Sequence, residues 1–277
     1  MQKASTQSQT ASRPVRQRPL IMGVINVTPD SFSDGGRFLD ADAAIEHGRE
    51  LADAGADLLD VGGESTRPGS LPVTAAEQWS RIGRVVAELA TGPLPVSVDT
   101  RTAEVARRAL AHGATIINDV SAGADPGLLR EVARFGATVV LMHMQGEPRS
   151  MQNRPEYRDC VEEVALFLSA ARARAIEAGV SPERAWVDPG IGFGKDLEHN
   201  LELLRALPRL VATGAPVVVG TSRKSFISGC SPADPNRRLA GSLASLVPAW
   251  RAGVHVVRVH DAFETRQFFD VLEQVGG

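Results

Sequence analysis

The sequence predicts a single-domain α/β protein, a (β/α)8 TIM barrel of eight parallel strands that are each followed by a helix. Three observations lead to this prediction. Eight short apolar runs occur along the chain, a segment with apolar residues at helical spacing follows each of them, and a glycine lies between each of the first seven helical segments and the next run. Eight such units in about 260 residues are typical of this barrel.

The apolar runs are mostly continuous stretches of Val, Ile and Leu rather than alternating patterns. Strands have this composition when both of their faces are buried, as they are in a barrel covered by helices. We therefore expect strands at Leu20–Ile25, Asp57–Val61, Pro95–Val98, Thr115–Ile117, Thr138–Met142, Ala185–Val187, Pro216–Val219 and His255–Val259.

The helical segments have apolar residues three and four positions apart. They span Asp40–Ala54, Thr74–Ala90, Thr102–His112, Leu128–Phe135, Tyr157–Ala178, Leu197–Thr213, Arg237–Ala252 and Ala262–Val275. Glycine adopts the left-handed conformation that ends many helices without strain, so we expect that conformation at Gly55, Gly92, Gly113, Gly136, Gly179, Gly214 and Gly253. An open doubly wound sheet is the alternative, but it requires a nucleotide-binding glycine motif that the sequence lacks.

Composition places the chain among globular proteins. It has 277 residues, of which 43% are hydrophobic and 23% are charged, close to the average for such domains. Residues 1–18 are rich in Ser, Thr and Gln and contain no apolar core of a secretory signal. We therefore expect a disordered N-terminal tail over 1–18, with an organellar presequence as the alternative, and a single folded domain over 19–277.

Charge and cysteine content bear on partners and compartment. The formal net charge is −3, and the longest apolar runs are far shorter than the roughly 20 residues that span a bilayer. We expect no nucleic-acid partner and no membrane partner. The two cysteines, Cys160 and Cys230, cannot form a disulfide framework, so a reduced cytoplasmic location is expected.

Residues that can bind or react follow the carboxyl end of every predicted strand. In a barrel these ends meet at one rim, where the active site lies. Singly, such residues have ordinary explanations: Asp99 or Asp188 can cap a helix, and His143 can be a satisfied core histidine. Together they favour one shared pocket, which would contain Asn26, Arg67, Asp99, Asn118, His143, Asp188, Lys224, Arg258 and His260.

The residue types in this pocket predict its ligand. One group is cationic or becomes so on protonation, and such groups bind phosphate or pyrophosphate: Arg67, Lys224, Arg258 and His260. A second group offers carboxylate and amide atoms that match a flat nitrogen heterocycle: Asp99, Asn118 and Asp188. The glycine-rich segments Ser33–Gly36 and Gly62–Gly69 can close over such a ligand.

Three other kinds of site do not match the sequence. The six histidines are scattered and there is no H-E-x-x-H, so no zinc site is expected. Gly190–Lys195 is not a phosphate loop of the G-x-x-x-x-G-K-[ST] type, because Pro189 stands at the first glycine and Asp196 follows the lysine. Gly220–Ser222 is not a hydrolase nucleophile elbow, because Lys224 replaces the closing glycine.

From about Pro19 to the C-terminus, the chain resembles the dihydropteroate synthase family, the targets of sulfonamide drugs. The resemblance is carried by Asn26–Gly36, Asp60–Gly69, Ser97–Thr100, Ile117–Asp119, Leu141–Gly146, Asp188–Lys195, Ser222–Ser225 and Arg258–Asp261. It implies a (β/α)8 barrel that joins p-aminobenzoate to 6-hydroxymethyl-7,8-dihydropterin pyrophosphate. The products would be 7,8-dihydropteroate and pyrophosphate, and sulfonamides would compete with p-aminobenzoate.

The resemblance also implies residue roles. The pterin would be held by Asp99, Asn118, Met142, Asp188, Phe193, Gly220 and Lys224. The pyrophosphate would be held by Asn26, Arg67, Arg258 and His260, with Asn26 also a ligand of the cofactor Mg²⁺. The p-aminobenzoate would be held by Phe32, Thr66, Pro68 and Ser225. The catalytic residues would be Asp34 (in the first loop), Arg67, Asp99, Lys224 and Arg258.

We expect a dissociative displacement in which Mg²⁺ and the cationic residues stabilise the departing pyrophosphate. One alternative is a catalytically silent pterin-binding paralogue, which would show erosion of the two loops or of Lys224. Another is a methyltetrahydrofolate methyltransferase, which needs no pyrophosphate cluster. By resemblance we also expect a homodimer packed through late helices, for which Leu243, Leu246 and Val247 are candidates.

Overall fold

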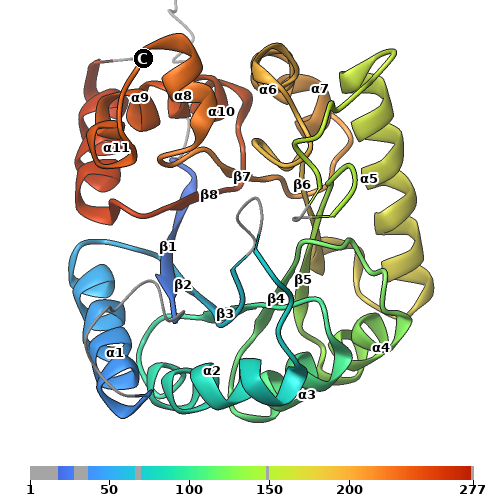
Figure 1. Cartoon of the computed structure of the whole chain (residues 1–277), viewed down its shortest axis with the longest axis vertical. Coiled ribbons are helices and arrows are strands. Elements are labelled where there is room, and N and C mark those ends of the chain that lie inside the picture. Colours follow the sequence, from blue (N-terminus) through green and yellow to red (C-terminus); the bar gives the residue numbers. More distant parts are fainter. Residues whose placement is uncertain (1–17, 28–36, 66–69, 148–149, 276–277) are drawn as a thin grey trace, which may run out of the picture.

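The computed structural model describes residues 18–27, 37–65, 70–147 and 150–275, and these form the expected barrel (Figure 1). Eight parallel strands run in the order β6-β5-β4-β3-β2-β1-β8-β7, and a bridge between Val187 and Val217 closes the ring. The strands are β1 (Leu20–Asn26), β2 (Leu58–Gly62), β3 (Val96–Asp99), β4 (Ile116–Asp119), β5 (Thr138–Met142), β6 (Ala185–Asp188), β7 (Val218–Gly220) and β8 (Val256–Val259).

The helices surround this ring (Figure 1). They are α1 (Arg37–Asp53), α2 (Ala75–Leu89), α3 (Ala103–Ala111), α4 (Pro126–Phe135), α5 (Cys160–Glu177), α6 (Leu197–Arg205), α7 (Leu207–Val211), α8 (Ser225–Cys230), α9 (Leu239–Ala244), α10 (Leu246–Ala252) and α11 (Ala262–Val275), with short 3-10 helices at Pro182–Arg184 and Pro235–Arg237. Among the described residues, none of these helices combines the length and the apolar composition needed to cross a bilayer.

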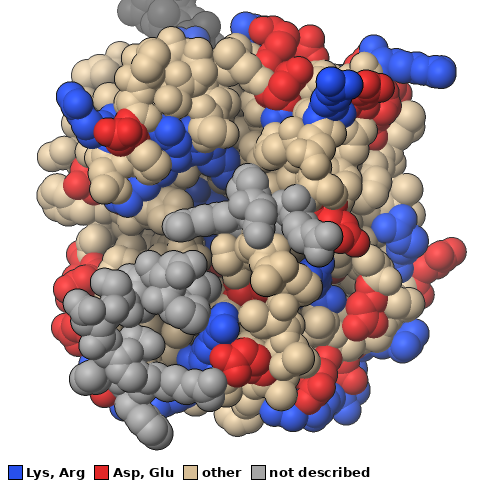
Figure 2. Space-filling view, in the orientation of Figure 1, with Lys and Arg blue, Asp and Glu red and all other residues tan. Residues whose placement is uncertain are grey.

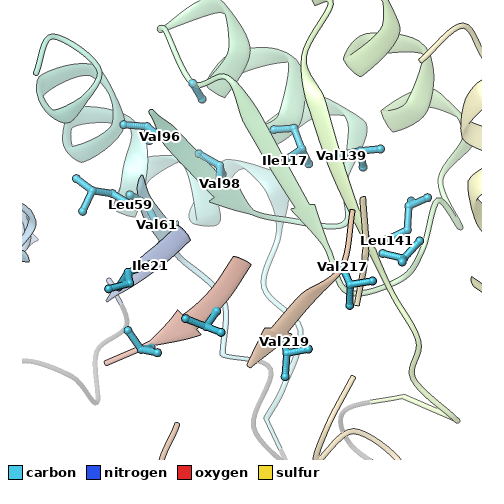
Figure 3. Packing of buried hydrophobic residues seen from close by; sticks show 14 of the residues in the cluster. Ile21, Leu59, Val61, Val96, Val98, Ile117, Val139, Leu141, Val217 and Val219 are labelled. Carbon is cyan, nitrogen blue, oxygen red and sulfur yellow. The ribbon is translucent and has the colours of Figure 1, made fainter. Parts of the chain in front are cut away.

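The outward faces of the strands pack against the helices and form the main core. Val96, Val98 and Ile117 belong to this layer (Figure 3), and they share one buried cluster with Ile82 and Val86 of α2. Because each strand is covered on this side by helices and on the other by the barrel interior, both faces are buried. This arrangement explains why the apolar runs are continuous rather than alternating.

The barrel interior is apolar at one end and polar at the other. The apolar end is a small separate cluster of Met22, Leu58, Ile116, Val140, Val218 and Val256, with Trp186 packed against it. Side chains two positions apart on a strand point to the same face. The next inward-facing residues on six of these strands are therefore Asp60, Asn118, Met142, Asp188, Gly220 and Arg258.

The glycines between helices and strands behave as expected at six of seven positions. Gly136 is an example: it follows α4 with a φ of 61°, and its N–H donates to the carbonyls of Ala133 and Val132. Gly92 differs, because its φ is not positive. The chain leaves α2 through Ala90 in the right-handed region with a φ of −68°, so no left-handed residue is needed there.

Two predicted helices are each divided in the structure. The helix expected at Leu197–Thr213 consists of α6 and α7, and the one expected at Arg237–Ala252 contains α9 and α10. Proline lacks an N–H donor and its ring clashes with the carbonyl four residues earlier. Pro208 is therefore found in the first turn of α7, and Pro248 lies close to the start of α10.

Of the predicted N-terminal tail, residues 1–17 lie outside the described residues, whereas Arg18 is described. Its guanidinium donates two hydrogen bonds to the Asp57 carboxylate, at 2.5 and 2.9 Å, and its backbone N–H donates to Oε1 of Glu273 at 2.8 Å. Asp57 also accepts from the backbone N–H of Ile21 at 2.8 Å. These contacts tie the start of β1 to the start of β2 and to α11.

Candidate active site

The strand registers bring the predicted site residues to one end of the barrel. Asn26 of β1 aligns with Gly62 of β2, Gly62 aligns with Asp99 of β3, and Asp99 aligns with Asn118 of β4. On the other side, Met142 aligns with Asp188, and Gly220 aligns with Arg258. The predicted pterin residues on these strands therefore share one rim.

Arg258 is at the centre of this group. Its Nε donates to Oδ2 of Asp60 at 2.7 Å, and its Nη2 lies 3.4 Å from Oδ2 of Asp99. Burial lowers the pKa of Arg258, but the two carboxylates outweigh this effect and the net shift is upward. The guanidinium thus stays charged and is oriented by two acidic residues inside the barrel.

Asp99 is buried, with 9% of its surface exposed. Burial, followed by the nearby Asp60 carboxylate, raises the pKa of Asp99 to about 7, against the opposing effect of Arg258. The helix-cap explanation does not apply, because Thr102 is the residue that precedes the first turn of α3. Asp99 is therefore a buried carboxyl group with a strongly perturbed pKa, as is common at functional sites.

Asp188 and Lys224 form the second charged part of the site. Burial lowers the pKa of Lys224 to about 8, with Asp188 opposing that shift. Burial raises the pKa of Asp188, which accepts a hydrogen bond from the backbone N–H of Gly190 at 2.7 Å. The Lys224 ammonium donates to the carbonyl of Ile191 and lies 4.5 Å from the centroid of the Phe193 ring. These residues therefore form one connected group at the polar end of the barrel.

The segment after β7 is held in an unusual conformation. Arg223 has a φ of 59°, a region that few residues other than glycine adopt. Its guanidinium pairs with Asp261, its N–H donates to Ser242, and its carbonyl accepts from Arg238. Lys224 then immediately precedes α8, a helix that the sequence analysis did not predict.

His260 is joined to the same segment. Its Nδ1 lies 3.0 Å from the hydroxyl of Ser222, and its backbone N–H donates to that oxygen at 3.3 Å. Lys and Arg side chains gather on the face near α8 and α9 (Figure 2). Ser225, the first residue of α8, is exposed. The predicted Arg258, His260, Lys224 and Ser225 are therefore on neighbouring segments.

The loop after β6 is organised by Lys195, a residue to which the sequence analysis gave no role. Only 2% of Lys195 is exposed. Its Nζ donates to the carbonyls of Gly190 and Phe193 at 3.0 and 2.9 Å, and lies 2.9 Å from Nδ1 of His143. Burial and then Lys195 lower the pKa of His143 to about 3, so His143 is neutral and accepts from the lysine. His143 is thus a satisfied core histidine.

The predicted site residues of the two glycine-rich loops, Phe32, Asp34, Thr66, Arg67 and Pro68, lie outside the described residues.

The described residues before the second loop are anchored to the barrel wall. Glu64 pairs with Arg101 at 2.9 Å and also lies 3.4 Å from the amide nitrogen of Gln78. Arg81 donates to the carbonyl of Gly63 at 2.8 Å. Side chains of α2 and of the segment after β3 therefore hold the start of this loop.

Asp60 is the second residue that the sequence analysis gave no role. It is fully buried on β2 and hydrogen-bonded to Ser97, Asn118 and Arg258. The signal was present, because Asp60 stands between Leu59 and Val61 in a strand expected to be buried. A buried carboxylate requires hydrogen-bond or charged partners. Buried titratable groups of this kind are concentrated at functional sites.

The described residues contain no group of three or more His, Cys, Asp or Glu side chains that could hold a metal ion. A Mg²⁺ ion usually takes one or two protein oxygens, with substrate phosphates and waters completing its shell. A Cβ atom placed at Gly62 would lie 3.8 Å from Oδ1 of Asn26 and 4.0 Å from Oδ2 of Asp99, so both oxygens lie near the side-chain-free Gly62. This donor set fits a magnesium ion that arrives with a phosphate ligand.

A family model described as "Pterin binding enzyme" matches residues 22–260. A dihydropteroate synthase from Neisseria meningitidis serogroup C is 46% identical over 264 residues, covering 94% of this chain and 93% of that protein. The dihydropteroate synthase from Escherichia coli K12 is 44% identical over 256 residues, covering 92% of this chain and 91% of that protein.

Solved structures also resemble this chain over most of its length. Dihydropteroate synthase from Xanthomonas albilineans with 4-aminobenzoic acid has a TM-score of 0.88 and 45% identity, covering 94% of each chain. The enzyme of the same organism with 7,8-dihydropteroate has a TM-score of 0.85 and 43% identity, again over 94% of each chain. Yersinia pestis dihydropteroate synthase with a sulfonamide drug has a TM-score of 0.88 and 41% identity, covering 94% of each chain.

Proposed function

Since the chain belongs to the dihydropteroate synthase family, whose members are transferases, we propose that the polar end of its barrel carries out the synthase reaction. In this reaction p-aminobenzoate displaces pyrophosphate from 6-hydroxymethyl-7,8-dihydropterin pyrophosphate and gives 7,8-dihydropteroate. The observation that carries the proposal is the meeting of the carboxylates of Asp99 and Asp188 with the cations Lys224 and Arg258 at one rim.

The pterin ring would bind between the two carboxylates. Asp99, Asn118 and Asp188 offer oxygen acceptors to ring N–H groups, and Lys224 offers a donor. Phe193 and the buried Met142 supply apolar surface around a flat ring. Gly220 is the inward-facing residue beside Arg258, and its lack of a side chain leaves room for the heterocycle.

The pyrophosphate would bind at the cationic part of the rim. Arg258 uses Nε and Nη2 on the carboxylates, so its other N–H groups are available for phosphate oxygens. His260 and Arg67 would add further donors, Arg67 from outside the described residues. Asn26 would offer its side-chain oxygen to Mg²⁺, which supplies charge neutralisation for the pyrophosphate when it is bound.

We propose a dissociative reaction. The bond between the exocyclic carbon and oxygen breaks with its electron pair leaving on pyrophosphate, and a pterin-stabilised cation remains. Arg258 and His260 stabilise the charge on the leaving group, and each such contact contributes about 2.7–4 kcal/mol in comparable sites. Asp99 stabilises the electron-poor ring. The amine lone pair then forms the carbon–nitrogen bond, and the nitrogen releases a proton.

The p-aminobenzoate would bind beside α8, where the exposed hydroxyl of Ser225 can donate to its carboxylate. Phe32, Thr66 and Pro68 would complete this pocket. Sulfonamides would compete there, in line with the sulfonamide complex of the Yersinia pestis relative.

We also propose a homodimer in the cytoplasm. Both described cysteines are free thiols, Cys160 buried and Cys230 exposed, which suits a reducing compartment. Leu243 and Val247 of α9 and α10 are partly exposed and available for a dimer contact. Leu246 is not, because only 2% of it is exposed and it belongs to the core of the barrel. Sedimentation at two protein concentrations tests the dimer.

Mass spectrometry of the reaction with both substrates and Mg²⁺ tests the proposed function. The intact enzyme should form dihydropteroate, and Asp188→Asn should form it at least about tenfold more slowly, because a hydrogen bond to a charged group is lost. A sulfonamide should suppress the reaction, with relief by added p-aminobenzoate. Pterin binding without any dihydropteroate would instead identify a silent pterin-binding protein.

A further inference from the structure

Asp60 is a fully buried carboxylate on the inward face of β2. Ser97 donates to its Oδ1 at 2.6 Å, while Arg258 and Asn118 donate to its Oδ2 at 2.7 and 3.3 Å. Two of its three partners are therefore residues proposed to bind the substrate. The Asp60 side chain is fully buried, whereas that of Arg258 is 23% exposed.

We propose that Asp60 is a positioning residue of the synthase reaction, which holds the guanidinium of Arg258 and the amide of Asn118 in the orientations that meet the pterin substrate. This inference rests on the proposed function, because it requires that Arg258 and Asn118 bind that substrate. Asp60 acts through these two residues.

The orientation of the Asn118 amide follows from the chemistry of its partner. An ionised carboxylate only accepts hydrogen bonds. Asn118 must therefore turn its nitrogen toward Asp60, which leaves its oxygen as the acceptor for a ring N–H. With a neutral amide at position 60, either orientation of the Asn118 amide could form a hydrogen bond to it. The Asn118 oxygen would then no longer be fixed as the acceptor that faces the pterin ring.

The plane of the Arg258 guanidinium is set in a similar way. The group is planar, so its contacts from Nε to Asp60 and from Nη2 to Asp99 together fix its orientation. The remaining N–H groups then have fixed directions before any ligand binds. Loss of the Asp60 charge weakens the shorter of these two contacts and allows Arg258 to rotate toward Asp99.

A double-substitution cycle tests this coupling in the full-length enzyme. The readout is the Kd of 6-hydroxymethyl-7,8-dihydropterin pyrophosphate, measured by calorimetry without p-aminobenzoate. Asp60→Asn should weaken binding about tenfold to a hundredfold, because a hydrogen bond to a charged group is lost. In an Arg258→Ala background, the same change should cost less than about threefold, because only its effect through Asn118 remains.

Asp119→Asn is the matched control. Asp119 is also fully buried at the end of a strand, but its hydrogen-bond donors are the N–H and hydroxyl groups of Ser121 and the N–H of Gly123, all in its own loop. Its effect on binding should be the same factor in both backgrounds. If Asp60→Asn also costs the same factor in both, Asp60 is only a structural residue and the proposal is overturned.

Steady-state kinetics gives a second readout. Asp60→Asn should raise KM for the pterin pyrophosphate while leaving KM for p-aminobenzoate within about twofold at saturating pterin substrate. A general loosening of the barrel would raise both. If Asp60→Asn does not fold, Ser97→Ala is the alternative variant, because it removes only one hydrogen-bond donor to Asp60. It should weaken pterin binding about two- to fivefold. Unchanged pterin binding in Ser97→Ala would contradict the proposal.

The single substitutions separate the binding role of Arg258 from the positioning role of Asp60. Unchanged pterin binding in Arg258→Ala would overturn the proposed function of that residue. A loss in Arg258→Ala with no change in Asp60→Asn would overturn only the positioning role of Asp60.

Discussion

The Lys224 ammonium lies over the ring of Phe193, 4.5 Å from its centroid. It also donates to the carbonyl of Ile191, and burial lowers its pKa to about 8. A buried ammonium is costly to desolvate unless its partners offset that cost. The position of Lys224 is therefore explained better by ligand binding than by stability.

Lys224→Ala tests this explanation. We expect kcat/KM to fall at least about a hundredfold, because a charge-assisted contact to the substrate is lost. The melting temperature should change by less than about 3 °C, because the removed desolvation cost offsets the removed contacts. A melting temperature that falls in step with activity would mean that Lys224 is structural.

Gly192→Ala tests the packing of Lys224 against the β6 loop. Gly192 has a φ of 82°, and a Cβ there would lie 3.0 Å from Cδ of Lys224. Gly214, with a φ of 76° and no atom within 4 Å of such a Cβ, is the matched control. Both alanine variants should lose about 1–2 kcal/mol of folding free energy from backbone strain.

Only Gly192→Ala should also weaken pterin binding, because only there does the new methyl group press on Lys224. Isothermal calorimetry on the two variants makes the comparison. Equal affinities would show that the β6 loop does not position this lysine.

The buried Lys195 predicts a pH dependence of stability. Burial lowers its pKa from 10.5 to about 7 in the folded protein. Between these values the unfolded chain binds more protons than the folded one, so the free energy of unfolding rises with pH. Lys224 contributes in the same direction, because burial lowers its pKa to about 8 in the folded protein.

Lys195→Met should reduce the rise of the free energy of unfolding with pH. Urea unfolding at several pH values between 7 and 10 measures this slope. Lys195→Met should also weaken pterin binding, because the carbonyls of Gly190 and Phe193 lose their donor. A slope as steep as that of the original protein would contradict the burial of a proton-releasing lysine.

Asp57 predicts a pH dependence of the same sign, but in the acid range. Burial raises its pKa, but the hydrogen bonds from Arg18 and Ile21 outweigh this effect and the net shift is downward. Its stabilisation is therefore present above the unfolded pKa and is lost as the pH falls through the folded value. Asp57→Asn should lower the free energy of unfolding by about 1–2 kcal/mol at pH 7, and by less in acid.

Asp42→Asn is the control, because Asp42 pairs with Arg84 at an exposed site where ion pairs contribute about 0–1 kcal/mol. Chemical unfolding at pH 7 and at pH 3 compares the two variants. Equal costs at pH 7 would show that the Arg18 contact adds no stability.

Much of the barrel was predictable because its strands are buried on both faces. Continuous runs such as Thr138–Met142 indicated the strands directly, and the register of a closed parallel barrel then placed Asp99, Asn118 and Arg258 on one rim. The breaks in the late helices were missed because helical spacing continues across them. Pro208 was the residue that marked one break.

The residues that the sequence analysis missed have roles that depend on neighbours distant in the chain. Asp60 contacts Arg258, which is 198 positions away, and Lys195 contacts His143, which is 52 positions away. A single sequence shows that such residues are charged, but it does not show which partner each one meets. The predictions for Phe32, Asp34, Thr66, Arg67 and Pro68 stay predictions.

The most direct test of the synthase account is pyrophosphate release by the purified protein with the pterin pyrophosphate and Mg²⁺, with and without p-aminobenzoate. The account predicts sustained release only when p-aminobenzoate is present, with one dihydropteroate formed for each pyrophosphate. Binding of the pterin substrate without release under either condition would contradict it.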